Sequence, residues 1–255
     1  MSFFDVLRGE LAKARTLRPV VRAVLSSVAL SLAYCLIEAS PDLGFTTPET
    51  AGVHALANLS FLAAVVGVLV VSGEHAGGQL TTTVLAAPRR GRVLAAKLLI
   101  ASGLTTALGL LLAVLVATLV QAPLGDRSVW TTGNGGTLLA SLALGVVSWT
   151  ALGLLSACAA FLVRSQTAVL TGMIVLTFGG VPLMMALPVF QYLPASAAVL
   201  LFVNREQQTS DWLNPPDLTV AGAGATVALW CVAAVVSAAV VFVRRDVGAR
   251  QAVVE

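Results

Sequence analysis

Residues 137–162 read TLLASLALGVVSWTALGLLSACAAFL, and no Asp, Glu, Lys or Arg interrupts them. A helix that crosses the hydrocarbon core of a bilayer, about 30 Å thick, needs about 20 apolar residues. A helix on the surface of a soluble protein keeps one polar face, whereas this stretch is apolar on every face, as lipid requires. The stretch therefore predicts a transmembrane helix.

The composition of the whole chain excludes an ordinary soluble domain. Hydrophobic residues make up 58% of the 255 residues, charged residues make up 11%, and the mean hydropathy is +0.93. A soluble domain carries about 25% charged residues. Because this chain lacks the charge to cover a water-exposed surface, we expect lipid to be the solvent for most of it.

Five further stretches share this character, so the sequence predicts an all-α integral membrane fold with six transmembrane helices. The expected spans are residues 20–38, 51–73, 94–121, 137–162, 166–190 and 220–243. We expect residues 1–255 to form a single transmembrane domain.

The distribution of Lys and Arg predicts the orientation. If the N-terminus is cytoplasmic, thirteen of these residues lie inside and only Arg127 and Arg205 lie outside. Cytoplasmic loops are enriched in Lys and Arg, so both termini are expected in the cytoplasm. The external side then gathers acidic residues in loops expected to be solvated, together with the turn 131–136. These acidic residues are Glu38, Asp42, Glu49, Asp126, Glu206, Asp211 and Asp217.

Residues 1–19 predict an amphipathic helix that lies in the cytoplasmic interface of the membrane. Its apolar stripe is expected to contain Phe3, Leu7, Leu11 and Ala14. Basic residues lie largely off that stripe, as in helices that rest on anionic lipid. A short disordered tail that sets the topology through its charges is the alternative.

The cytoplasmic loop 74–92 is too long for a simple turn between spans. Residues 79–87 are expected to form a short helix that ends at Pro88, followed by a cluster of arginines. Such a surface suits docking to another protein. The alternative is that the arginines only anchor the next span to lipid headgroups.

Residues 182–203 predict a re-entrant helical hairpin on the external side. Pro182, Pro188 and Pro194 interrupt an otherwise apolar run. Proline removes a backbone donor, and broken backbone at membrane depth must be surrounded by protein or a water-filled cavity. One long kinked helix is the alternative.

The sequence offers no sign of catalysis, a metal site or a cofactor of its own. Cys35, Cys158 and Cys231 show no CxxC spacing, and neither histidine lies in an HExxH pattern. No GxxxxGK[ST] pattern occurs, so ATP would have to bind to a partner. An intramembrane enzyme is accordingly disfavoured, and we expect no catalytic residue and no metal ligand.

The polar residues within the spans are candidates for a substrate path. These candidates are Asn58, Ser60, Thr171 and Thr177. Polar side chains of this kind also hold helices together, which is the alternative interpretation. Because ionisable groups are missing near the span centres, an ion-coupled secondary carrier is disfavoured and an apolar or amphipathic cargo is favoured.

Three segments resemble bacterial permease subunits of the ABC-2 class of transporters. The loop after the second span resembles the equivalent loop of that family at Glu74, Gly78, Thr81, Thr82, Thr83, Pro88, Arg89, Arg90, Arg92 and Lys97. The N-terminal segment is similar to the family's interface helix at Glu10, Lys13 and Arg18, and residues 192–196 resemble the motif before its last span. Ala76 and Gly77 depart from the bulkier or basic residues of many relatives.

The resemblance implies the transmembrane subunit of an ATP-driven exporter in the bacterial cytoplasmic membrane. Two permease chains, identical or sister copies, would pair in the lipid and rest on a cytoplasmic ABC ATPase that holds ATP and magnesium. Loop 74–92 would be the coupling helix, with Glu74, Gly78, Pro88, Arg89, Arg90, Arg92 and Lys97 at or near the ATPase. The expected cargo is a drug, a lipid or a peptide, and no nucleic acid is expected as a partner. A non-transporting scaffold or immunity protein remains the alternative function.

Overall fold

The computed structural model describes residues 3–40, 53–72, 90–163, 165–202 and 217–244. Every regular element in these ranges is a helix, and five helices are long and apolar enough to cross a membrane. The all-α class and the membrane character predicted from the sequence are therefore confirmed.

The helices follow the chain in a simple order. They are α1 (Phe3–Thr16), α2 (Arg18–Glu38), α3 (Val53–Asn58), α4 (Ser60–Ser72), α6 (Arg90–Leu115), the π-helix η2 (Val116–Val120), the 3₁₀-helix η3 (Ala122–Arg127), α7 (Val129–Thr132), α8 (Gly135–Leu162), α9 (Gln166–Ala186), the 3₁₀-helix η4 (Pro188–Tyr192), α10 (Pro194–Leu200) and α12 (Val220–Arg244).

The five membrane-length segments are α2, α3 with α4, α6 with η2, α8, and α12. Most of their bounds lie within a few residues of the predicted spans. The exception is α9, whose apolar part, Gln166–Gly180, is shorter than the other five segments. The sixth crossing, expected over 166–190, therefore stays a prediction.

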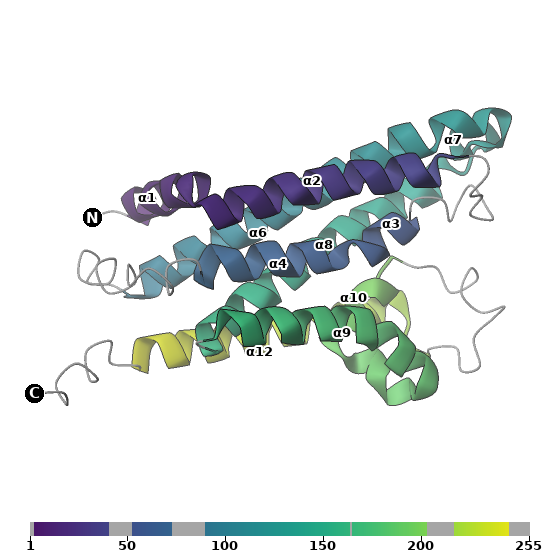
Figure 1. The fold of residues 1–255 in the computed structure, drawn as a ribbon. Coiled ribbons are helices and arrows are strands. Elements are labelled where there is room, and N and C mark those ends of the chain that lie inside the picture. The colour runs from purple at the N-terminus through teal and green to yellow at the C-terminus, as the bar shows by residue number, and fades with distance from the viewer. Residues whose placement is uncertain (1–2, 41–52, 73–89, 164, 203–216, 245–255) are drawn as a thin grey trace, which may run out of the picture.

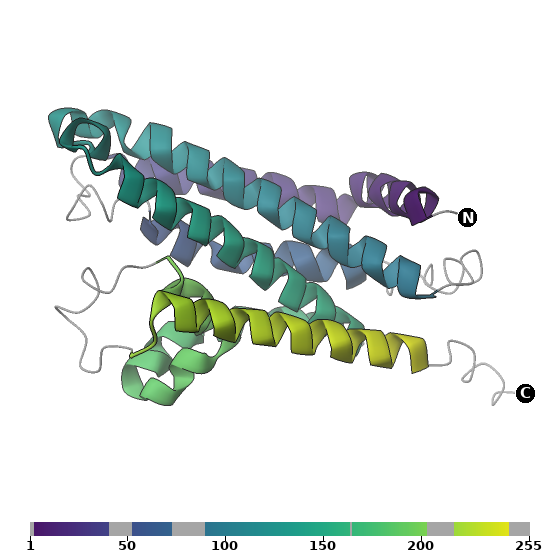
Figure 2. The ribbon, with the colours of Figure 1, turned by 180° about the vertical axis from the view of Figure 1, so that it is seen from behind.

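The long helices run side by side along one axis, as Figures 1 and 2 show from opposite sides. One end of the bundle, here called the basic end, carries α1, the beginnings of α2 and α6, and the last turn of α12 (Figure 1). Its described basic residues are Arg8, Lys13, Arg15, Arg18, Arg22, Arg90, Arg92, Lys97 and Arg244. The opposite end has only Arg127 among the described residues. Which side of a membrane the basic end faces stays a prediction.

Helix α8 is the central element, and it packs most extensively on α4, α6 and α12. Its contact with α4 is a close approach of backbones, because a Cβ atom at Gly67 would collide with the Ser156 hydroxyl and the Gly153 carbonyl. Its contact with α6 is similar, because a Cβ atom at Gly153 would collide with Thr105. Small residues at such positions let transmembrane helices approach closely.

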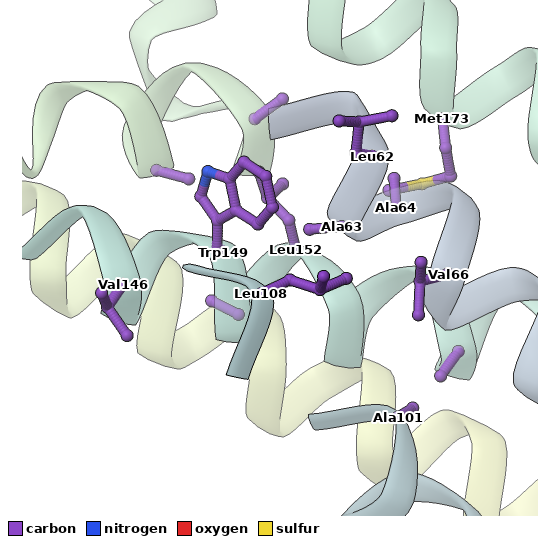
Figure 3. Packing of buried hydrophobic residues seen from close by; sticks show 14 of the residues in the cluster. Leu62, Ala63, Ala64, Val66, Ala101, Leu108, Val146, Trp149, Leu152 and Met173 are labelled. Atoms are coloured by element: carbon purple, nitrogen blue, oxygen red, sulfur yellow. The ribbon is translucent and has the colours of Figure 1, made fainter. Parts of the chain in front are cut away.

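Large apolar side chains fill the space around these close contacts. Figure 3 shows Trp149 and Leu152 from α8 with Leu62 from α4, Leu108 from α6 and Met173 from α9, all members of one buried cluster. Trp149 is completely buried and is the largest such side chain in the described residues. The core therefore joins four helices that are distant in sequence.

The connection between α6 and α8 is folded by local hydrogen bonds, and residues 131–134 and 136 of the turn are exposed, as expected. The Gln121 carboxamide oxygen, which is fully buried, accepts hydrogen bonds from the Ser128 hydroxyl (3.4 Å) and the Val129 amide (3.3 Å). The Trp130 indole N–H donates to the Ala117 carbonyl of η2 at 3.1 Å. Glycines with positive φ, Gly125 (51°) and Gly133 (83°), make the reversals that other residues rarely adopt. Local hydrogen bonds thus fix the shape of a connection whose outer residues stay exposed.

The segment after α9 folds back onto the bundle. Helix α9 continues through Pro182 to Ala186, so the backbone breaks later than the predicted start of the hairpin at 182. The chain turns through η4, and α10 returns to pack against α9, α8 and α12. The turn is held by the Gln191 carboxamide oxygen, which accepts from the Leu218 amide at 3.0 Å, and by the Trp230 indole, which donates to the Tyr192 carbonyl at 2.9 Å. Its depth in a bilayer stays a prediction.

We expect Gly67→Ala to destabilise the protein by about 1–3 kcal/mol, the usual cost of overpacking a core. The new methyl group would meet the Gly153 carbonyl, which is backbone and cannot rotate away. Gly103→Ala is the matched control, because Gly103 is exposed on α6 and its Cβ would have nothing within 4 Å. The measurement is the apparent melting temperature in detergent. An equal response of the two variants would contradict the close α4–α8 contact.

Candidate functional site at the basic end

Helix α1 is joined to α2 by a sharp break at Leu17, where the backbone is extended (φ −67°, ψ 109°). Pro19 is tolerated immediately afterwards because the first turn of a helix has no use for its missing N–H. The sequence predicted one helix over 1–19 and a span from 20, whereas α2 already begins at Arg18. The break lets α1 leave the line of α2 and pack across α6.

The apolar stripe of α1 lies against protein. Ala14 is buried, and Leu7 and Leu11 pack against the buried cluster. The outward face carries Arg8 and Arg15, both exposed, along with Phe4, which is 71% exposed. The stripe predicted from the sequence is therefore real, but the surface that it covers is the bundle. Whether the outward face rests in the lipid interface stays a prediction.

A buried ion pair joins α1 to α6. The Lys97 ammonium donates to Glu10 Oε2 at 2.6 Å, and the Lys13 ammonium donates to Glu10 Oε1 at 2.8 Å. The side chains of Glu10 and Lys97 are 5% and 2% exposed, whereas that of Lys13 is 35% exposed. Glu10 therefore bridges a partly exposed lysine on its own helix and a deeply buried lysine on α6.

This pair is costly to bury, so its geometry matters. Taking two charges out of water costs several kcal/mol each, and the attraction between them repays this cost only when the hydrogen bonds are good. Such pairs contribute little net stability, but removal of one partner is strongly destabilising because it leaves a buried charge. The pair therefore fixes where α1 sits along α6.

The sequence placed Glu10 and Lys13 in an interface helix and Lys97 at an ATPase contact, and the structure brings these three residues together. Lys97 presents almost no surface to a partner in this conformation. Arg18 is exposed at the start of α2, and Arg90 and Arg92 lie in the first turn of α6. Glu74, Gly78, Pro88, Arg89 and the short helix expected over 79–87 lie outside the described residues.

The predicted substrate-path residues do not form one site. The Asn58 amide donates to the Tyr34 hydroxyl at 2.6 Å, linking α3 to α2. Ser60 is buried and donates to the Ala57 carbonyl at 2.7 Å, and Thr177 donates to the Met173 carbonyl at 2.8 Å within α9. Thr171 is exposed on α9. Only the Asn58 bond joins two separate spans, as the alternative interpretation expected, whereas the Ser60 and Thr177 bonds return to carbonyls three and four residues earlier in their own segments.

The acidic residues of the opposite end are not all solvated. Asp126 and Asp217 are exposed, as expected, but Glu38 is the last residue of α2 and is 7% exposed. It lies one helical turn beyond Tyr34, so the two side chains share a face of α2. Asp42, Glu49, Glu206 and Asp211 lie outside the described residues.

Comparison with known proteins adds no family to this picture. No protein-family model matches the chain, and no curated protein matches it. In the part of the chain that the structure describes, no group of three or more His, Cys, Asp or Glu residues is placed to hold a metal ion. The features that stand out at the basic end are the buried ion pair and the exposed arginines around it.

Substitutions at the ion pair test its buried character. We expect Glu10→Gln to cost about 3–5 kcal/mol, because it removes the carboxylate from the buried Lys97. Lys97→Met should cost less, since Lys13 still neutralises Glu10. The double variant should lose less stability than the sum of the two, and Lys13→Met should lose no more than about 1 kcal/mol. Apparent melting temperatures in detergent compare the two single variants with the double variant. If the two losses of stability simply add, Glu10 and Lys97 do not interact.

Proposed function

We propose that this chain is the membrane-spanning subunit of an ATP-driven exporter of the ABC-2 class. A separate cytoplasmic ABC ATPase would bind ATP and magnesium, and a second permease copy or a sister permease would complete the pair. The observation that carries the proposal is the buried Glu10–Lys97 pair, which ties α1 to the base of α6. In the resemblance to the family, α1 is the interface helix, and α6 directly follows the coupling segment 74–92.

The arrangement supports a path for force from the ATPase into the bundle. A push on residues 74–92 would reach α6, which begins at Arg90, as well as α4, which ends at Ser72. The ion pair would carry α1 along with α6, and the contact between Thr105 and Gly153 would carry the push to α8. Two rigidly packed helices move as a body more readily than they deform, so the subunit would rock about the axis of the dimer.

The exposed faces of the spans favour an apolar or amphipathic cargo, such as a drug, a lipid or a peptide. Helices α2 and α12 are the least buried of the five long segments, and their outward side chains are apolar. Such faces suit lipid and a second permease chain. A hydrophilic cargo would need polar groups that converge inside the bundle, and the predicted path residues do not converge.

Purification of the tagged chain from native membranes in mild detergent tests the partner. We expect a near-stoichiometric protein that carries a GxxxxGK[ST] motif, identified by mass spectrometry. A known transporter of this class, purified in parallel, is the control for conditions that preserve the complex. A chain that repeatedly emerges alone would contradict the exporter and favour a scaffold, an immunity protein or an ATP-independent carrier.

Charge reversal in the coupling segment tests its role. We expect Arg89→Glu with Arg90→Glu to lower cargo-stimulated ATP turnover by at least tenfold while leaving insertion and topology intact. The control is Arg244→Glu with Arg245→Glu, which makes the same charge change at the end of α12. Unchanged turnover in the first variant would show that the arginine cluster only anchors the chain to headgroups.

A further inference from the structure

The second membrane-length segment is not one continuous helix. Helix α3 ends at Asn58 and α4 begins at Ser60, with Leu59 in a turn between them. The Leu62 amide donates to the Leu59 carbonyl at 2.9 Å, a bond across three residues instead of four. Neither proline nor glycine is present at the break, so its cause lies in the surrounding structure.

Side chains satisfy the backbone where the helical ladder is interrupted. The Leu56 carbonyl accepts from the Trp149 indole N–H at 2.9 Å, and the Ala57 carbonyl accepts from the Ser60 hydroxyl at 2.7 Å. Within a bilayer a freed carbonyl has no water to bind, so such partners are required. The Trp149 indole therefore satisfies a carbonyl that the break leaves free, and it holds α3 to α8.

Helix α3 is attached to α8 through one residue, Leu56. The Leu56 side chain fits over Gly145, where a Cβ atom would lie 2.6 Å from Leu56 Cδ1. Trp149, one turn further along α8, holds the carbonyl of the same Leu56. The base of the Trp149 side chain lies against Gly109 of α6, where a Cβ atom would lie 3.2 Å from the Trp149 Cβ. A single residue of α3 thus carries both attachments.

The other side of α3 faces α2 through a polar contact at the surface. The Asn58 amide donates to the Tyr34 hydroxyl at 2.6 Å, and Asn58 is exposed. Helix α2 also contacts η2, the π-helical end of α6. The break between α3 and α4 and the π-helix η2 therefore both lie beside α2, and both depart from regular α-helix. π-Helical turns are frequent at functional sites.

We propose that α3 is a hinged gate that pivots at Leu59 and opens a lateral gap toward α2. Opening would break the Asn58–Tyr34 contact while α4 stays locked to α8 at Gly67. The rim of the gap joins the Tyr34 and Asn58 polar groups to Ile37, which lies one turn beyond Tyr34 on α2 and is 52% exposed. Such a rim suits an amphipathic molecule that passes between the bundle and the lipid. Its use for release of cargo rests on the proposed exporter function, whereas the hinge itself does not.

Thiol labelling of the full chain in nanodiscs, without any ATPase, tests the hinge. The three native cysteines are replaced by alanine, and a single cysteine is placed by Ala55→Cys on α3 or by Ala63→Cys on α4. Both positions are completely buried, so reaction with a maleimide requires opening. We expect the α3 position to react and the α4 position to stay protected.

Trp149→Phe keeps the ring but removes the N–H donor. Loss of one buried hydrogen bond should raise the labelling rate at the α3 position about fivefold. Trp230→Phe is the matched control, since it removes the same kind of indole–carbonyl bond on α12, away from the gap, and should leave the rate unchanged. Equal protection at the two cysteine positions, no response to Trp149→Phe, or an equal rise at both positions would overturn the hinge.

Two reagents distinguish a lateral gap from a path to water. An apolar maleimide dissolved in the bilayer should label the α3 position faster than a charged, water-soluble maleimide, and the reverse order would overturn the lateral gap. Hydrogen exchange of amides 53–58 against 60–72 in the unsubstituted chain gives the same comparison if a cysteine variant fails to fold. Faster exchange in 53–58 is expected, and equal exchange would overturn the hinge. If the labelling follows the expected pattern but the chain binds no ATPase, the hinge proposal stands and the exporter proposal fails.

Discussion

The close approach of α4 and α8 at Gly67 and Gly153 is the contact on which the rest of the bundle depends. Lipid tails are as apolar as the side chains of these helices, so the hydrophobic effect gives them little reason to associate. Van der Waals contact must do so, and it requires backbones without side chains between them. Because Gly153 also receives Thr105 of α6, one residue of α8 positions two other helices. The remaining helices attach to this three-helix core.

Polar side chains attach further segments to the core at its two ends. At the basic end, Glu10 and Lys97 satisfy each other in a nearly dry site, so α1 becomes part of the bundle. At the opposite end, Gln121 and Trp149 supply hydrogen bonds to backbone that has left the regular helix. In both places a side chain supplies what water supplies in a soluble protein. These polar residues are thus placed where helices begin, break or turn.

Hydropathy alone predicted the helical class and most of the membrane-length segments, because lipid demands apolar residues on every face of a span. For α8 the expected start at 137 and the observed start at Gly135 differ by two residues. Glu10 and Lys97 are 87 residues apart in the sequence, and no local pattern predicts that they pair. No pattern near Leu59 in the sequence predicts the break, because the side chain that binds the freed Leu56 carbonyl is Trp149, 93 residues away. The apolar stripe of α1 was visible, but periodicity does not say whether lipid or protein will cover it.

The two halves of the bundle differ in how they can respond to force. From the basic end to the middle, α4, α6 and α8 are regular helices locked by glycine contacts, and locked helices transmit displacement without absorbing it. Toward the opposite end, α6 becomes π-helical at Val116 and the second segment breaks at Leu59. In the proposed exporter, a displacement that enters through α6 would therefore meet its first irregular elements beside α2. We expect a change of shape driven from the basic end to appear there, because the close glycine contacts of α4, α6 and α8 resist deformation.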